Sequence, residues 1–332
     1  MTDRPRVFAT RVLPGSALAE LARSCDLDVW AERSIPPPAA LAERVAAAEG
    51  LLCLLTDRID AALLGGAPRL RAVSSVSVGI DHIDLPAATA RGIPVGHTPG
   101  VLTETTADLA FALLLAAARR VPEADRFVRE GRWRPPQVWE PDLLLGRDVH
   151  GATLGLLGLG AIGRAVARRA GGFGMRVRAW SRSRRPLGDL EGLLRWAEFD
   201  ELLATSDFMS VHVALAPGTR GLLDARALAA MKPGAVLVNT ARGGIVDEEA
   251  LAAALAEGRI AAAGLDVFAG EPLDPGSPLL ALPNVVLTPH IGSASQATRA
   301  RMAALAVENL VAALAGRRMP ACANPDVYGQ SR

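Results

Sequence analysis

Short apolar runs alternate along the chain with longer stretches rich in Ala, Leu and Arg. The apolar runs have the length of buried strands, and the stretches between them are long enough for helices. This alternation predicts an α/β fold in which parallel strands are joined by helices. In the first 100 residues it predicts a small doubly wound unit, with strands at Arg6–Ala9, 51–55, Ala72–Ser75 and 94–96 and helices at Ala17–Ser24, 39–47 and 60–64.

A long helix is predicted over residues 101–120, where Thr103 or Thr105 can cap the amino end. Its density of apolar residues favours burial between layers over a surface position. The segment 133–141 contains proline and tryptophan and is typical of a loop or arm. These two features separate the first alternating set from a second one.

The second alternating set begins at Thr153. Its expected strands are Thr153–Leu157, Arg176–Trp180, Phe208–Val211, 235–239, Ala262–Leu265 and Val285–Leu287. Six strands with intervening helices are what a dinucleotide-binding domain requires. A last helix, at 294–314, closes the chain, and it could pack back on the first unit and make that unit discontinuous.

Length, charge and cysteine spacing indicate the number of domains and exclude several classes of binding protein. At 332 residues the chain exceeds the usual size of one hydrophobic core, so two domains are expected. A net charge of +1 offers no bulk attraction to nucleic acid or to an anionic membrane. Cys25, Cys53 and Cys322 form neither a metal-ligand spacing nor a disulfide framework. Since the cysteines have no such spacing, no metal site is predicted. No signal peptide or membrane-spanning run is recognisable, so a cytoplasmic protein is predicted.

The strongest local motif is a glycine-rich turn between a predicted strand and a predicted helix. Gly158 permits the tight turn, Gly160 lets the backbone approach a pyrophosphate, and Gly163 allows close contact between helix and strand. The amino end of the helix presents free N–H groups and a partial positive charge to the phosphates. This context makes a glycine-rich turn without a ligand the minor alternative.

The end of the next predicted strand indicates which dinucleotide binds. Enzymes that use NAD place an Asp or Glu about 20 residues after the glycines, on the ribose 2′-hydroxyl. Here Ser181, Arg182 and Ser183 stand there, followed by Arg184 and Arg185, with no acid. A charge run is usually a solvated loop, but an arginine fork suits a 2′-phosphate. The missing acid therefore favours NADP(H), with Arg182 as the best candidate and NAD(H) as the alternative.

Three polar residues follow predicted strands of the second set, where ligands bind in open α/β sheets. They are Arg242, Glu271 and His290. An arginine fork can hold a substrate carboxylate, and a histidine that titrates near neutral pH can protonate a carbonyl oxygen. A carboxylate can orient that histidine and favour its protonated form. Each residue alone has a structural alternative, such as a cap, a turn or a loop contact, but the three together favour reduction of a 2-keto acid.

These segments resemble the D-isomer-specific 2-hydroxyacid dehydrogenase family over nearly the whole chain. The resemblance rests on GLGAIG, NTARGGIVDEEAL, AAAGLDVFAGEPL and LTPHIGSAS. Arg242, Glu271 and His290 match the family's catalytic residues. The resemblance implies a Rossmann-type nucleotide domain, residues 101–286, inserted into a flavodoxin-like substrate domain, residues 1–100 and 287–332. It also implies a homodimer built through the nucleotide domains.

Within the family, the chain is most similar to glyoxylate/hydroxypyruvate reductases, through LLCLLTDRID, SVGIDHID and TPGVLTETTADLAFALLLAAARR. This likeness implies that the Val78 and Gly79 N–H groups bind the substrate carboxylate and that NADPH is favoured. It implies further cofactor contacts at Ala161 and Ile162 (pyrophosphate), at Thr240 and Asp266 (nicotinamide amide), and at Gly292 and Ser293.

One departure from the family concerns the closing of the substrate pocket. In some relatives a tryptophan of the partner subunit closes it, whereas here Leu143 matches that place, with Trp139 nearby. The expected reactions are reduction of glyoxylate to glycolate and of hydroxypyruvate to D-glycerate. The alternatives are a reductase of 2-ketogluconate or of an aromatic keto acid, a homologue acting on formate or phosphite, and a dinucleotide-sensing corepressor without activity.

Overall fold

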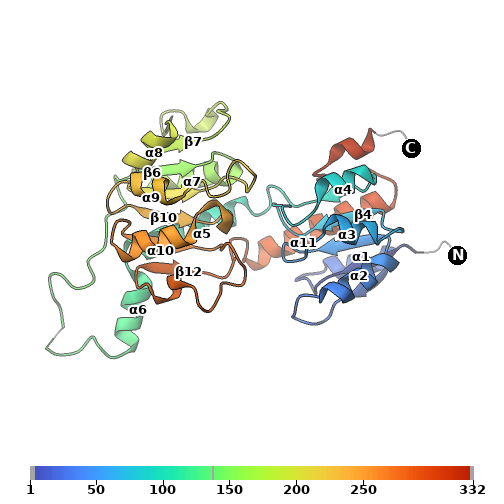
Figure 1. Cartoon of the computed structure of the whole chain (residues 1–332), viewed down its shortest axis with the longest axis horizontal. Helices are drawn as coiled ribbons and strands as arrows, with labels where there is room; N and C mark the ends of the chain where they lie inside the picture. Colours follow the sequence, from blue (N-terminus) through green and yellow to red (C-terminus); the bar gives the residue numbers. More distant parts are fainter. Residues whose placement is uncertain (1–3, 137, 330–332) are drawn as a thin grey trace. The chain divides into compact units, whose positions relative to one another are not determined.

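The computed structural model describes residues 4–136 and 138–329. Its internal contacts divide the chain into two compact units, each of which is described by itself (Figure 1). Unit 1 comprises the described residues of Met1–Leu102 and Ser293–Arg332, and unit 2 comprises Thr103–Gly292 except residue 137. The expected second domain boundary, 286/287, falls within β12 (Val285–Leu287), which is hydrogen-bonded to β11 (Ala262–Leu265). For this reason the change of unit comes later, after Gly292.

Unit 1 is built on a five-stranded parallel sheet. Its strands are β1 (Arg6–Ala9), β2 (Asp26–Val29), β3 (Gly50–Cys53), β4 (Ala72–Ser75) and β5 (Val95–Gly96). The strand order, β2-β1-β3-β4-β5, is that of the flavodoxin-like doubly wound fold. Its α-helices are α1 (Ala17–Ser24), α2 (Pro38–Ala47), α3 (Ala61–Gly65), α4 (Leu85–Ala90) and α11 (Gln296–Leu314).

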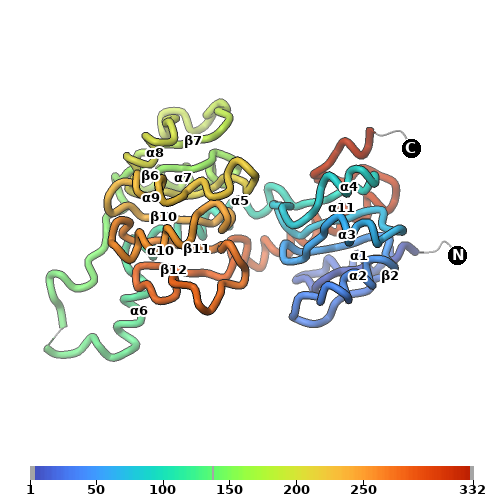
Figure 2. Tube along the Cα trace, viewed as in Figure 1, coloured from blue at the N-terminus to red at the C-terminus, as the bar shows by residue number. Residues whose placement is uncertain are grey.

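The core of unit 1 lies in two layers, one on each face of its sheet. One apolar cluster contains Leu41 of α2, Leu64 of α3 and Ala88 of α4, and the other contains Leu21 of α1 and Leu310 of α11. The predicted last helix therefore does pack on the sheet formed by the first residues of the chain. Figure 2 shows this return of the C-terminal segment, in red, to the blue N-terminal strands.

Unit 2 contains a seven-stranded parallel sheet in the order β12-β11-β10-β9-β6-β7-β8. Besides β11 and β12, its strands are β6 (Thr153–Leu157), β7 (Arg176–Trp180), β8 (Leu194–Trp196), β9 (Phe208–Val211) and β10 (Val236–Asn239). Its α-helices are α5 (Thr103–Ala118), α6 (Val121–Arg129), α7 (Ala161–Gly172), α8 (Phe199–Thr205), α9 (Ala225–Ala230) and α10 (Glu248–Ala256). Numbered from β6, this is the Rossmann order with one further strand, and the order reverses between β6 and β9.

The helix α5 is buried against this sheet, as its apolar composition predicts. Phe111, Leu113 and Leu114 belong to the same apolar cluster as residues of α7 and β6. The approach to β11 depends on Gly264, where a Cβ atom would lie 2.9 Å from that of Leu113. None of the helices in the described part of the chain has the length and apolar character needed to cross a membrane.

Several elements were not predicted individually from the sequence, among them α4, β2, β8 and α6. The strand β2 reads DLDV and has no fully buried residue, because it lies at the edge of its sheet and carries two acids. The strand β8 is an edge strand of only 3 residues. The helix α6 has no buried residue and starts directly after the expected end of the long helix. The segment after it, 133–141 except residue 137, has no regular secondary structure, which confirms the predicted loop.

Candidate active site

Three neighbouring strands of unit 2 carry the predicted chemical groups at their carboxyl ends. Arg242 follows β10, Glu271 follows β11 and His290 follows β12. Since these strands are parallel and adjacent in the sheet, the segments after them emerge at one edge. The carboxyl edge of the sheet therefore gathers an arginine, a carboxylate and a histidine.

His290 and Glu271 are in direct contact. His290 Nδ1 lies 2.7 Å from Glu271 Oε2, and the Phe268 N–H donates to Glu271 Oε1 at 3.0 Å. Burial by itself would raise the pKa of the Glu271 carboxyl, but the hydrogen bonds from His290 and Phe268 and the charge of Arg242 outweigh it and lower that pKa. The carboxylate is therefore ionised at neutral pH. It fixes the imidazole so that Nε2 is directed away from it, and both side chains keep partial exposure of 23% and 27%.

The loop that carries His290 is held by Asp266, which is buried directly after β11. The Asp266 carboxylate accepts hydrogen bonds from the Thr288 hydroxyl and from the N–H groups of Ile291 and Gly292, at 2.6–2.8 Å. The His290 N–H donates to the Asp266 carbonyl at 2.9 Å, and His290 adopts a φ of 52°. A left-handed backbone at a non-glycine residue is strained, and these contacts stabilise it.

Arg242 stands on a loop that packs tightly against the loop after β11. The Asn239 side chain binds both ends of this turn, donating to the Arg242 carbonyl and accepting from the Ala241 N–H, each at 3.0 Å. A Cβ atom at Gly243 would lie 1.8 Å from the carbonyl carbon of Phe268, so only glycine permits this approach. The glycine in the sequence ARGG thus brings Arg242 to the loop that bears Glu271.

The glycine-rich turn has the geometry of a phosphate-binding loop. Gly158 has a φ of 104°, and a Cβ there would lie 2.7 Å from the carbonyl of His212. A Cβ at Gly163 would lie 2.3 Å from the Gly158 oxygen, whereas one at Gly160 would meet nothing within 4 Å. The open space at Gly160 leaves room for a ligand beside the backbone. Ala161 and Ile162 form the first turn of α7, so their N–H groups belong to the free amino end of that helix.

The side chain under this turn, His212, is half-buried, and its Nε2 lies 2.8 Å from the Ser210 hydroxyl. Burial lowers the pKa of His212 to about 4, so the imidazole is neutral at physiological pH. It supports the turn by packing and brings no charge to a bound phosphate.

We expect Gly163→Ala to lower the free energy of unfolding by about 1–3 kcal/mol, because the new methyl group would meet the Gly158 carbonyl oxygen. Gly172→Ala, in the same helix but with open space around its Cβ, should leave the protein unchanged or stabilise it by up to about 1 kcal/mol. Urea unfolding of both variants measures the difference. Equal stability of the two would contradict the contact between Gly158 and Gly163.

The loop after β7 carries the arginines predicted to select the cofactor. Arg184 already pairs with Glu198 and lies over the Trp196 ring at 5.9 Å. Arg182 is exposed, and its Nη1 would be 3.7 Å from a Cβ at Gly218, in the loop after β9. Ser181 is half-buried and Ser183 is exposed. No carboxylate occupies positions 181–185.

Sequence reasoning missed the residue that shapes this loop. Arg164, the residue after Gly163, donates to the carbonyls of Pro186 and Leu187 at 2.6 and 2.8 Å. It thereby ties the loop after β7 to the first turns of α7. The only signal in the sequence was its place directly after the third glycine.

The described residues fit a nicotinamide dinucleotide on both sides of the reversal in strand order. On the β6–β7 side lie the glycine turn and Arg182, and on the β10–β12 side lie Asp266, Gly292 and Thr240. Thr240 is buried, and within the described part of the chain its hydroxyl has no hydrogen-bond partner. A buried polar atom without a partner is costly unless a ligand satisfies it.

Three predicted residues belong to unit 1, and the structure describes them within that unit. Val78 and Gly79 lie in the loop after β4, and Ser293 begins the second segment of the unit. In unit 2, Leu143 is half-buried, while Trp139 has 77% of its surface exposed.

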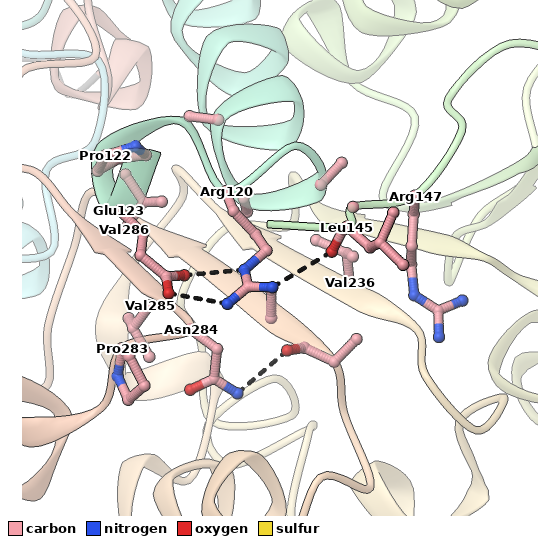
Figure 3. A pocket seen from close by; sticks show the side chains of 16 residues that line it. Arg120, Pro122, Glu123, Leu145, Arg147, Val236, Pro283, Asn284, Val285 and Val286 are labelled. Carbon is pink, nitrogen blue, oxygen red and sulfur yellow. Dashed lines mark hydrogen bonds and ion pairs between the residues drawn. The ribbon is translucent and has the colours of Figure 1, made fainter. Parts of the chain in front are cut away.

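A hollow of about 560 Å³ in unit 2 is not this site. It is lined by the first residues of β10, β11 and β12 and by Arg120, whose guanidinium donates to the Glu123 carboxylate at 2.8 Å (Figure 3). These strand starts lie at the edge opposite the carboxyl ends that bear Arg242, Glu271 and His290.

Comparisons with known proteins agree with this geometry. A family model described as the NAD-binding domain of D-isomer-specific 2-hydroxyacid dehydrogenases matches residues 111–292. A glyoxylate reductase of Korarchaeum cryptofilum is 50% identical over 324 residues, covering 98% of this chain and 97% of that protein. A solved structure from Thermus thermophilus has a TM-score of 0.89 at 52% identity, covering 96% of this chain and 99% of that one.

An NADPH-dependent glyoxylate/hydroxypyruvate reductase of Sinorhizobium meliloti, solved with NADP and malonate, has a TM-score of 0.85 at 35% identity and covers 96% and 97% of the two chains. Matches of this extent and identity establish common ancestry as well as a common fold. The chain therefore belongs to the D-isomer-specific 2-hydroxyacid dehydrogenases, enzymes that use a nicotinamide dinucleotide to interconvert 2-keto and 2-hydroxy acids.

Proposed function

We propose that the protein reduces glyoxylate to glycolate and hydroxypyruvate to D-glycerate with NADPH. The observation that carries the proposal is the pair of His290 and Glu271, 2.7 Å apart at the carboxyl edge of a dinucleotide-binding sheet. The relatives named glyoxylate reductase, which match almost the entire chain, support the choice of a small 2-keto acid.

In this proposal unit 1 is the substrate domain and unit 2 the nucleotide domain. The fork of Arg242 and the N–H groups of Val78 and Gly79 bind the substrate carboxylate. The bound nicotinamide supplies a hydride to the keto carbon. His290, held by Glu271, gives its proton to the keto oxygen, so that two electrons and two hydrogens are added in total. The Glu271 carboxylate binds Nδ1 of the imidazole and so leaves Nε2 to make this transfer.

The assignment of NADPH as the cofactor rests mainly on the loops that follow β6 and β7. The N–H groups at Gly158–Gly163, including those of Ala161 and Ile162, bind the pyrophosphate at the amino end of α7. Arg182, with Ser181 and Ser183, binds the 2′-phosphate of NADPH. Thr240, Asp266, Gly292 and Ser293 line the nicotinamide end of the cofactor.

Arg182→Gln should raise the KM for NADPH by about 10–100-fold, because a hydrogen-bonded charge contact to the phosphate is worth about 1.5–3 kcal/mol. The KM for NADH, which lacks that phosphate, should change little. Arg185→Gln removes the same charge from an exposed position of the same loop and serves as the control. If both variants change the two KM values alike, the loop acts only through its overall charge and the assignment of Arg182 is wrong.

The product identifies the reaction. Incubation with NADPH and hydroxypyruvate should give glycerate of the D configuration, resolved by chiral chromatography, in equal amount to the NADPH oxidised. Parallel reactions with 2-ketogluconate and phenylpyruvate measure the rival substrates. Formation of L-glycerate, or faster turnover of the bulkier acids, would contradict the proposal.

We further propose that the protein is a homodimer formed through unit 2. The segment from α6 to residue 148, except residue 137, extends from the rest of unit 2 in Figure 1, and its exposed apolar side chains include Val128, Trp133, Trp139 and Leu145. Exposed apolar groups gathered on one segment are typical of an interaction surface. Light scattering should give twice the chain mass, and a monomer at working concentrations would overturn the dimer.

A further inference from the structure

A buried polar cluster in unit 1 lies beneath the loop after β4. Ser75 and Ser77 are buried, and their hydroxyl oxygens are 2.7 Å apart. Ser75 Oγ is also 3.1 Å from His82 Nε2, and the Ser77 hydroxyl donates to the Gly79 carbonyl at 2.7 Å. Three short contacts thus lead from His82 to the loop that contains Val78 and Gly79.

The direction of these hydrogen bonds follows from counting protons. A carbonyl oxygen only accepts, so the Ser77 proton lies on the contact with Gly79. The contact between the two serines then needs the Ser75 proton, and the contact between Ser75 and His82 needs a proton on Nε2 of His82. Only this order places one proton in each contact.

The carbonyl groups of Ser77, Val78 and Gly79 each have a hydrogen-bond partner. The Thr98 N–H donates to the Ser77 carbonyl at 2.8 Å, and His97 Nδ1 lies 3.1 Å from the Val78 carbonyl. Because a carbonyl only accepts, His97 carries its proton on Nδ1, the opposite tautomer from His82. With the Gly79 carbonyl bound by Ser77, three successive peptide groups are fixed in orientation.

This arrangement determines where the N–H groups of the loop are directed. In a trans peptide the C=O of one residue and the N–H of the next lie on opposite sides. The N–H groups of Val78, Gly79 and Ile80 are therefore directed away from Thr98, His97 and Ser77 respectively. In the described part of the chain, no backbone carbonyl accepts from the Gly79 or Ile80 N–H.

We propose that His82, Ser75 and Ser77, together with His97, are positioning residues that orient the N–H groups of the 78–80 loop for the carboxylate of a 2-keto acid. The inference deepens the proposed function and rests on it. The ordered chain of hydrogen bonds removes the need to reorganise the loop when the anion binds, and preorganised donors bind more tightly than mobile ones.

The kinetic test compares two buried serines, Ser77 in the loop after β4 and Ser74 within β4. Ser77→Ala removes the donor to Gly79, and it should raise the KM for glyoxylate and the Kd for oxamate, an unreactive carboxylate, by about tenfold. The kcat and the Kd for NADPH should stay within about twofold of the wild type. Ser74→Ala is the matched control, because Ser74 is buried in β4, three residues before Ser77, and its hydroxyl has no partner among the described residues. Equal KM values for the two variants would overturn the positioning role.

A second measurement determines the histidine tautomers directly in the wild-type protein. Two-bond 1H–15N spectra of the 15N-histidine-labelled wild type distinguish the tautomers, with His82→Gln and His97→Gln used for assignment. We expect the Nε2–H form for His82 and the Nδ1–H form for His97, and an Nδ1–H form for His82 would overturn the ordered chain. If the tautomers are as expected but the wild type reduces no 2-keto acid, the proposed function fails while the order of the hydrogen bonds stands.

Discussion

His290→Gln is expected to lower kcat for glyoxylate by about 10²–10⁴-fold, the usual contribution of a general acid. Glutamine can still form a hydrogen bond but carries no proton that it can transfer. The Kd for NADPH, measured by fluorescence titration, should remain unchanged. His150→Gln replaces an exposed histidine of the same unit and should behave like the wild type.

The contact between His290 and Glu271 adds a sharper form of the same test. Because Glu271 acts through the imidazole, Glu271→Gln should lower kcat, but the double variant should be hardly slower than His290→Gln alone. Independent, multiplicative losses would show that the two residues do not act as a pair. Unchanged turnover in His290→Gln would show that His290 is not the general acid.

Arg242→Lys is expected to lower kcat/KM for glyoxylate by about 10–100-fold, equivalent to about 1.5–3 kcal/mol for a charged hydrogen bond. Lysine keeps the positive charge but loses the planar fork that binds both carboxylate oxygens. Most of the loss should appear in KM, with the Kd for NADPH unaffected. Arg226→Lys, at an exposed position of α9, is the control for the same substitution elsewhere in unit 2.

A loss in Arg242→Lys that is confined to kcat would contradict carboxylate binding as the main role of Arg242. It would instead indicate that turnover depends on the exact placement of the guanidinium beside Glu271, whose pKa the charge of Arg242 helps to lower. Comparing oxamate binding in the wild type and the variant separates these roles, because oxamate has the carboxylate but is not reduced.

The buried strands were predictable because their side chains are apolar on both faces. The strand β10 has both Val236 and Val238 in one apolar cluster and Leu237 in the other, and this continuous run is visible in the sequence. The edge strands β2 and β8 lack that signal, because only one side of each is covered and their sequences, DLDV and LRW, mix charged with apolar residues. The helix α6 was missed because none of its residues is buried, so its sequence has no continuous apolar run either.

The glycine turn and the residues after β10, β11 and β12 were visible in the sequence, because they follow predicted strands in recognisable motifs. The contacts that hold them were not. The Asp266 carboxylate joins residues 22–26 positions away, and Arg164 reaches carbonyls 22 and 23 positions away. Such contacts depend on how loops from different strands meet, which the pattern of apolar residues does not encode.

The central claim is tested most directly by the initial rates of NADPH and NADH oxidation with glyoxylate, at one enzyme concentration. We predict rapid oxidation of NADPH and a kcat/KM at least tenfold higher than with NADH, as the loop with Arg182 and without an acid requires. If neither cofactor is oxidised while NADPH still binds, the protein is not a glyoxylate reductase, and this result would contradict the proposed roles of His290, Glu271 and Arg242.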